Sequence, residues 1–280
     1  MQIEDYGLIG DTHTAALVGR DGSIDWLCLP RFDSGACFAA LLGEREHGRW
    51  KLAAAGEDVA TRRQYRASTL VLETEWTTAT GTARVIDFMP PRQDSHSEVI
   101  RIVEGVEGTV DMEMDLVLRF EYGSDIPWVR KVRGGLQAIA GPNAVELTSQ
   151  VPLQGRHLHT EAHFSVGEGE RVPFVFCWYE AHHKAPQVDD AEIALSETVS
   201  YWEDWCAGIV PCEGEWNELV SRSLVTLKAL TYHPTGGIVA APTTSLPEAI
   251  GGVRNWDYRY CWVRDATLTL DALIDSGRRE

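Results

Sequence analysis

The hydrophobic pattern of this chain changes its period once, near residue 189, and that change limits the folds open to it. Before this point apolar and polar residues alternate, most clearly between Val110 and Phe120, where every second residue is apolar. Alternation of this length is typical of a strand with one buried face. After residue 189, apolar residues recur at helical spacing. The pattern therefore predicts a β region followed by helices.

The β region contains short strands separated by turn signals. Asp21-Gly22 lies between two such strands, at 14–18 and 23–29, and is typical of a tight hairpin. Residues 70–76 and 158–166 also alternate, and the short apolar run 174–179 fits a strand covered on both faces. Further turns are indicated at Gly81, Gly105, Gly108, Gly134-Gly135, Gly141-Pro142 and Gly167. We predict an antiparallel β-sandwich over residues 1–188.

A linking helix is expected next. Asp189-Asp190 is typical of a helix N-cap, and Leu195, Val199, Trp202 and Cys206 follow at helical spacing. Gly and Pro residues then interrupt the pattern between 207 and 214. Residues 189–214 are therefore predicted to form a linker helix and a domain boundary.

Residues 215–280 are predicted to begin a second, helical domain. One helix is expected from about Glu215 to Tyr232 and another from about Trp262 to Ser276, joined by a long loop over Ile238–Asn255. The expected buried stripes are Trp216, Leu219, Val220, Leu224 and Leu227 in the first helix, and Ala266, Leu270, Leu273 and Ile274 in the second. Two helices cannot close a core around such faces. We expect the chain to be part of a longer protein, or a partner to cover this surface.

Composition excludes several classes of function. The chain has 42 acidic and 25 basic residues, a net charge of −17, which disfavours nucleic acid and anionic membranes as partners but does not repel a neutral sugar. The N-terminus lacks the features of a signal peptide, and no apolar run approaches the ~18 residues of a membrane span. The six cysteines, at positions 28, 37, 177, 206, 212 and 261, form no CxxC pair and no metal-ligand spacing. We expect a cytoplasmic protein with free thiols, no metal and no cofactor.

The segment Arg254–Asp265 carries the clearest chemical signal. Its twelve residues include four aromatics, three Arg and two Asp, at the entry to a predicted helix. Flat rings can cover the C–H face of a pyranose, while guanidinium and carboxylate groups fix its hydroxyls. The same pattern allows another interpretation, in which Arg264 and Asp265 form a buried ion pair and the aromatics belong to the core. Spacing alone does not choose between the two.

At this segment the chain resembles a known family. Asn255–Asp265 is similar to the signature of glycoside hydrolase family 15, which contains glucoamylases, glucodextranases and bacterial trehalases. Residues 241–248 and Gly251-Gly252 resemble the bacterial branch of that family. Segments near the start of the chain, at 6–11, 14–18, 21–28 and 30–34, resemble the trehalase-like N-terminal domain. The resemblance thus spans nearly the whole chain.

The resemblance implies an α/α barrel of six helical hairpins after the sandwich, of which only the first helices are present here. It also implies inverting hydrolysis of an α-linked glucose sugar, either trehalose or a maltooligosaccharide, by an acid and a base roughly 6.5–9.5 Å apart. By motif position, Tyr258 and Trp262 would shape the wall of the glucose pocket, and Arg264 and Asp265 would bind the sugar hydroxyls.

The family's catalytic acid and base lie in later barrel segments, beyond residue 280. No catalytic residue is therefore expected in these residues, and the chain alone is expected to be inactive; Glu248 and Asp257 receive no catalytic role. Arg31 or Asp33 could border the site in a full-length enzyme. Two other functions stay open: a non-catalytic sugar-binding or regulatory relative, and a sandwich module that forms homo-oligomers.

Overall fold

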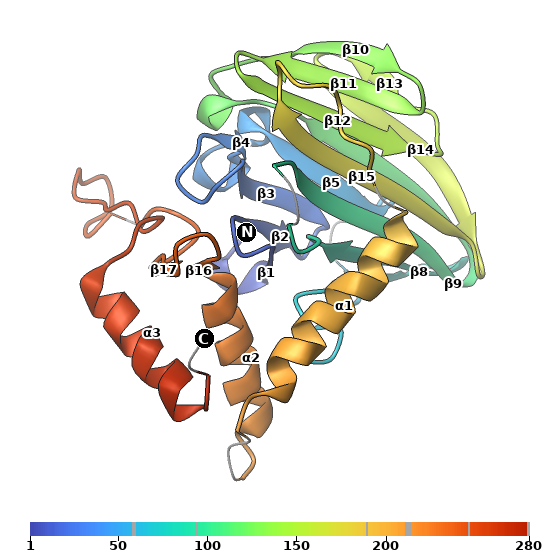
Figure 1. Cartoon of the computed structure of the whole chain (residues 1–280). Helices are drawn as coiled ribbons and strands as arrows, with labels where there is room; N and C mark the ends of the chain where they lie inside the picture. The colour runs from blue at the N-terminus through green and yellow to red at the C-terminus, as the bar shows by residue number, and fades with distance from the viewer. Residues whose placement is uncertain (58–59, 93–94, 189, 211–213, 246, 279–280) are drawn as a thin grey trace.

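The computed structural model describes residues 1–57, 60–92, 95–188, 190–210, 214–245 and 247–278. Two antiparallel sheets pack face to face and share one long strand (Figure 1), which confirms the predicted sandwich. The first sheet runs β1-β2-β3-β5-β9-β14-β13, with β4 added to β3. The second sheet runs β6-β7-β8-β9-β15-β12-β11-β10.

The strands of the sandwich have the following bounds: β1 Tyr6–Gly10, β2 Ala15–Gly19, β3 Ser23–Cys28, β4 Ala36–Phe38, β5 Arg49–Ala54, β6 Arg62–Tyr65, β7 Leu72–Thr77, β8 Gly81–Phe88, β9 Ser97–Val117, β10 Trp128–Val132, β11 Gly135–Ala140, β12 Asn143–Ser149, β13 Gln154–Arg156, β14 His159–Gly167 and β15 Arg171–Glu180. The C-terminal part contains α1 Ala191–Ala207, α2 Asn217–Ala229, the short strands β16 Thr231–Tyr232 and β17 Gly237–Ile238, and α3 Val263–Asp275.

The shared strand β9 explains the strongest alternation in the sequence. Its second half lies in the first sheet, and Val110, Met112, Met114 and Leu116 all point into the core. The strand passes from one sheet to the other at Gly105 to Gly108, where a Cβ on Gly105 would lie 1.9 Å from a carbonyl oxygen of β14. Because only glycine permits that approach, the crossing falls at this point. The strand ends at Val117, three residues earlier than the alternation suggested.

A buried ion pair joins the two sheets inside the sandwich. Arg101 and Asp87 are both fully buried, and Arg101 Nε donates to Asp87 Oδ1 at 2.7 Å. Arg101 Nη2 also donates to Asp87 Oδ2 at 3.3 Å. On the side of the first sheet, Nη1 donates to Trp50 O at 2.7 Å and Nη2 to Gly22 O, in the turn between β2 and β3, at 2.8 Å. A buried charge is tolerated when it is paired and fully hydrogen-bonded, and this arginine meets both conditions.

Helix α1 begins where the sequence predicted. Asp190 is its N-cap and accepts hydrogen bonds from the backbone N–H groups of Glu192 and Ile193; Asp189, the other proposed cap residue, lies outside the described residues. The first half of α1 packs on the outer face of the second sheet through Ala194 and Leu195. The second half runs past the sheet and carries Trp202 and Trp205 into contact with α2 and α3.

The predicted apolar stripes of α2 and α3 are only partly buried. In α2 the structure buries Leu224, Val225 and Ala229, while Trp216 and Leu219 are exposed. In α3 it buries Thr269 and Leu273, and Leu270 and Ile274 are exposed. The reason is geometric: α1 supplies a partner for one face of these helices only. Helix α2 also ends at Ala229 rather than Tyr232, because residues 231–232 pair with 237–238 in a small hairpin.

One further sequence expectation is corrected. Leu158 begins the alternating run 158–166 and is expected in a strand, but it lies exposed in the two-residue turn between β13 and β14 with a φ of 64°. The described cysteines, at 28, 37, 177, 206 and 261, form no disulfide. Within the described residues, no helix is both long and apolar enough to cross a membrane.

Candidate functional site

The chemically richest segment folds as one arm of an irregular hairpin. Ala240 and Ala241 donate backbone hydrogen bonds to Tyr260 and Tyr258, at 3.2 and 2.9 Å, and Ser245 donates to Trp256 at 2.7 Å. The region predicted as a loop, residues 238–255, therefore lies antiparallel to the motif along much of its length. This pairing leads the chain directly into α3, and Figure 1 shows both arms beside the helix.

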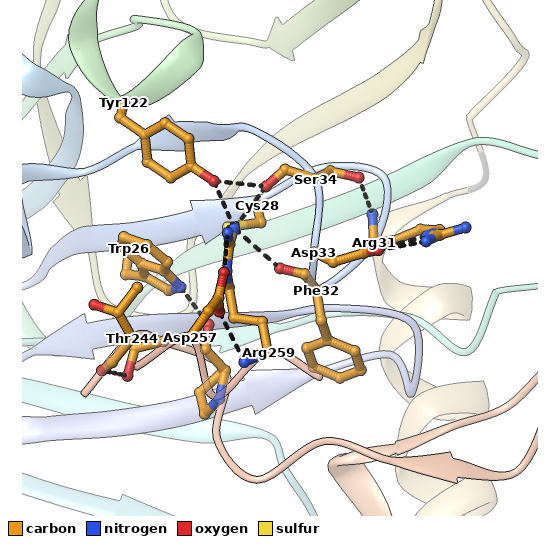
Figure 2. Close-up of polar contacts among 12 residues, drawn as sticks. Trp26, Cys28, Arg31, Phe32, Asp33, Ser34, Tyr122, Thr244, Asp257 and Arg259 are labelled. Carbon is orange, nitrogen blue, oxygen red and sulfur yellow. Dashed lines mark hydrogen bonds and ion pairs between the residues drawn. The ribbon is translucent and has the colours of Figure 1, made fainter. Parts of the chain in front are cut away.

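Arg259 anchors this hairpin to the sandwich. Its side chain is buried and reaches the loop that follows β3, where the guanidinium donates to Ser34 O at 2.8 Å. It also donates to the hydroxyl of Tyr122, in the turn after β9, at 2.6 Å. The same group lies 3.4 Å from Phe32 O and from Cys28 Sγ (Figure 2). These acceptors come from sequence positions more than 130 residues away from Arg259. One side chain therefore fixes where the motif sits.

Asp257 supplies the counter-charge for this buried guanidinium. Its carboxylate accepts from Arg259 Nη2 at 2.8 Å and Nε at 3.0 Å, a two-pronged arrangement that matches the fork of an arginine. The hydrogen bonds from Arg259 lower the pKa of Asp257 below its ordinary value. Burial raises the pKa of the nearby Cys28 thiol to about 12, so this sulfur faces the guanidinium as a neutral group.

Trp26 makes a second link between the sandwich and the hairpin. This fully buried indole donates from Nε1 to Pro242 O at 2.7 Å (Figure 2). Because Pro242 lies on the arm opposite Arg259, both arms are tied to the same end of the sandwich. The hairpin is therefore held on a rigid support.

The structure brings together the two aromatic residues predicted to line a sugar pocket. The rings of Tyr258 and Trp262 meet edge to face, with centroids 5.5 Å apart and an interplanar angle of 89°. Trp262 Nε1 donates to Asp257 O at 3.0 Å, which fixes the orientation of the indole. Trp256 packs against the same indole at 6.4 Å. Tyr258 and Trp262 thus form one aromatic unit beside the anchor.

Arg264 and Asp265 lie in the first turn of α3, directly after the aromatic unit. Arg264 Nη2 and Asp265 Oδ2 are 2.9 Å apart, and the Arg264 side chain is 67% exposed. The pair therefore forms, but it is not the buried ion pair that the alternative interpretation required. The more buried pair of the motif is Asp257–Arg259, in which Arg259 is buried and Asp257 partly buried. The Arg264 guanidinium therefore has N–H groups that face solvent, and these can donate hydrogen bonds to a sugar hydroxyl.

Sequence reasoning missed the role of Arg259, although it stands inside the motif. A signal was present: along 256–260 the side chains alternate, so that Asp257 and Arg259 turn inward while Trp256 and Tyr260 are exposed. That alternation is visible only once the segment is known to be extended. The acceptors of Arg259 could not be located from the sequence.

Arg31 and Asp33 lie at the border between the sandwich and the C-terminal part. They form an ion pair at 2.5 Å, and the Arg31 guanidinium lies 5.7 Å from the centre of the Tyr232 ring. Together with Tyr232, Tyr260 and Arg259 they line a small cavity of about 150 Å³. This loop therefore lies against the C-terminal part of the chain, and a role of Arg31 or Asp33 at the border of the site stays a prediction.

Each carboxylate near the motif is held by an arginine. Asp257 pairs with Arg259, Asp265 with Arg264, and Glu248 with Arg254 at 3.5 Å. A general acid needs a raised pKa, and the hydrogen bonds from Arg259 lower the pKa of Asp257 instead. These carboxylates are suited to binding and positioning.

Two family models match the chain. The model described as trehalase-like, N-terminal, matches residues 1–175, and the model of glycosyl hydrolases family 15 matches residues 214–280. The first match alone covers more than half of the chain. The second contains the hairpin, the aromatic unit and α3.

Curated relatives align along the same length. A trehalase of Thermoplasma volcanium is 36% identical over 99% of this chain, and a trehalase of Mycolicibacterium smegmatis is 35% identical over 98%. A trehalase of Mycobacterium tuberculosis is 34% identical over 98% of the chain. The chain spans 45% of the length of the first two relatives and 44% of the third. With both models matched in this order, the chain belongs to glycosyl hydrolases family 15, in the branch that carries a trehalase-like N-terminal domain.

Proposed function

We propose that the protein of which these residues are part hydrolyses α-glucosidic bonds, with trehalose as its preferred substrate and maltooligosaccharides as the alternative. The observation that carries this proposal is the alignment of relatives named trehalase along 98–99% of the chain. A neutral disaccharide also suits a protein with a net charge of −17. A reducing, cytoplasmic location belongs to the same proposal, and the absence of disulfides among the described cysteines supports it.

In this proposal the motif holds the non-reducing glucose. Tyr258 and Trp262 present ring edges and faces to the C–H surface of the sugar, while Arg264 donates to its hydroxyls and Asp265 accepts from them. The support is geometric: the rings are packed against each other, and the charged pair follows within one turn of α3. Arg259 acts as a positioning residue, because it holds the segment that carries both rings.

The reaction itself is proposed to follow an inverting mechanism with carboxylates from outside these 280 residues. One carboxylic acid protonates the leaving oxygen, and a second carboxylate activates water on the opposite face of the ring, roughly 6.5–9.5 Å away. The ion pair of Asp257 with Arg259 supports this placement, because it lowers the pKa of the one carboxylate that is partly buried within the hairpin. The chain alone is then inactive.

The first test is glucose release from trehalose and from maltotriose, measured for these 280 residues and for the full-length product of the gene. We expect activity only in the longer protein, with trehalose preferred. Activity of the shorter chain would place the acid and base within it. If neither form releases glucose although both are folded, the non-catalytic, sugar-binding relative is the better description.

The sugar-binding assignment has its own test in the full-length protein. Arg264→Ala and Asp265→Ala each remove one partner of a charged hydrogen-bond network, which costs about 1.5–3 kcal/mol and lowers kcat/KM roughly 10- to 150-fold. Asp271→Ala, at an exposed position of the same helix, is the matched control and is expected to keep its activity. Near-normal kcat/KM for both site variants would refute the assignment.

A further inference from the structure

A second cluster of reactive side chains lies outside the motif, on the outer face of the second sheet. It consists of His96, Glu98 and Cys177, whose ligand atoms all lie within 4.8 Å of one another. Cys177 and Glu98 are buried, and His96 is partly buried beside them. The cluster belongs to strands β9 and β15 and to the residue just before β9, whereas the motif lies after β17.

The register of two strands creates this cluster. Cys177 on β15 stands directly opposite Glu98 on β9 in the antiparallel ladder. His96 precedes Glu98 by two residues, so its side chain lies on the same face of the extended chain. That face continues through Ile100 and Val175, which α1 covers. Three side chains therefore converge from two adjacent strands, beneath the middle of α1.

The distances suit a small divalent ion. His96 Nε2 and Glu98 Oε1 are 3.5 Å apart. Two ligand atoms that are each about 2.1 Å from a tetrahedral zinc ion lie roughly 3.4 Å from each other. The set of one imidazole, one carboxylate and one thiol is typical of zinc and similar transition metals, whereas calcium and magnesium prefer oxygen ligands alone.

An acidic cavity opens onto the cluster. It has a volume of about 410 Å³ and is lined by His96 and Glu98 from the sheet side and by residues of α1 on the other. Asp11 and Arg92 in its lining form an ion pair at 2.7 Å, and three further carboxylates remain, those of Glu98, Glu197 and Asp204. This imbalance attracts cations, and the cavity provides an entry path and room for a fourth ligand.

We propose that His96, Glu98 and Cys177 bind one transition-metal ion of the Zn²⁺ class, with the fourth coordination position open to the cavity under α1. Three protein ligands and one open position are the arrangement in which zinc keeps a water molecule or takes an exogenous ligand. The site is distinct from the proposed sugar site, and its test does not depend on hydrolase activity.

The test uses the chain freed of metal with a chelator and titrated with Co²⁺. We expect one Co²⁺ per chain and an intense near-ultraviolet band from thiolate-to-metal charge transfer, which equimolar Zn²⁺ then abolishes. This measurement needs no variant. A stoichiometry near zero, or a Co²⁺ spectrum without a thiolate band, overturns the proposal.

Variants then identify the ligands. Cys177→Ser and His96→Ala should each weaken Co²⁺ binding at least tenfold, and Cys177→Ser should remove the charge-transfer band, while far-ultraviolet circular dichroism confirms that both fold. Cys206→Ser, which alters another partly buried thiol, is the matched control and should keep the band. A second group of possible ligands, Glu180, His182 and His183, is exposed. If His183→Ala abolishes binding, or Cys177→Ser keeps the band, the assignment is wrong.

Discussion

Arg259 shows how one residue can determine the position of a site that it does not enter. Its guanidinium is buried between the sandwich and the hairpin, where a carboxylate, a hydroxyl and backbone carbonyls surround it. An arginine fits this position because its planar fork presents five donors in fixed directions. A lysine would satisfy only part of this set. The aromatic unit depends on this contact, because Asp257 also fixes Trp262.

Replacing Arg259 with methionine tests this role. The change leaves Asp257 and two carbonyl groups without their donor, and we expect the free energy of unfolding to fall by about 3 kcal/mol. The matched control is Arg254→Met, in an exposed ion pair of the same segment, which should change stability by less than about 0.5 kcal/mol. Urea unfolding measures both, and limited proteolysis reports whether residues 240–262 detach. Equal effects from the two variants would contradict the anchoring role.

The ion pair of Asp257 also predicts a pH dependence. Its pKa is lower in the folded chain than in the unfolded chain, because Arg259 donates hydrogen bonds to the carboxylate. The stabilisation is therefore complete above the unfolded value of about 3.9 and is lost as the pH falls through the lower, folded value. We expect the stability difference between the native chain and Asp257→Asn to be constant near neutral pH and to shrink below about pH 4. A difference that stays constant in acid would contradict this.

Helix α1 connects the two parts of the molecule, and the contribution of its N-cap to stability can be measured separately. Asp190 accepts two backbone hydrogen bonds and carries a negative charge at the positive end of the helix dipole. Asp190→Ala should lower the free energy of unfolding by about 1 kcal/mol. Ser196→Ala, at an exposed position in the middle of α1, is the control and should be neutral or slightly stabilising. Thermal unfolding of both variants provides the measurement.

At the scale of the elements, the strands followed from the sequence more closely than the helices. The alternation in 110–116 predicted which side chains of β9 are buried, because a strand has two faces and a covered sheet hides one of them completely. A helix stripe says only which residues are apolar. Whether Leu219 and Leu270 are covered depends on which neighbours are present. Among the described residues, α1 and the edge of the sandwich at Leu70 cover the opposite face of these helices.

Several large apolar side chains at α2 and α3 are exposed, and together they are called the helical apolar surface. Trp216 and Leu219 of α2, and Leu270 and Ile274 of α3, are each half or more exposed. Apolar patches of this kind mark an interface, since soluble surfaces seldom gather so many large side chains. These four side chains belong to α2, its N-cap and α3, so we do not expect the sandwich to take part in a contact made through them.

We therefore expect the 280-residue chain to associate with itself through this surface. Sedimentation velocity should show an average mass that rises with protein concentration, and the double variant Leu219→Glu/Leu270→Glu should shift it toward the monomer. Leu42→Glu, which alters an exposed leucine on the sandwich, is the matched control and should leave association unchanged. A chain that stays monomeric at all concentrations would contradict this expectation.

The sequence by itself determined the order of the structural classes, the antiparallel sandwich, the start of α1 and the family. These rest on local patterns: alternation, capping residues and a contiguous motif can be read without knowing what lies nearby in space. Tyr258 and Trp262 were brought together as expected, because a motif of neighbouring residues needs little more than its own backbone.

Only the tertiary structure decided which arginine of the motif is buried, which faces of α2 and α3 are covered, and that His96 and Glu98 meet Cys177. Each of these depends on groups far apart in the chain: Arg259 reaches Ser34, and Cys177 stands opposite Glu98 through the register of β9 and β15. Sequence spacing carries no record of such pairings, because strand register and the docking of a hairpin are set by packing across the whole molecule.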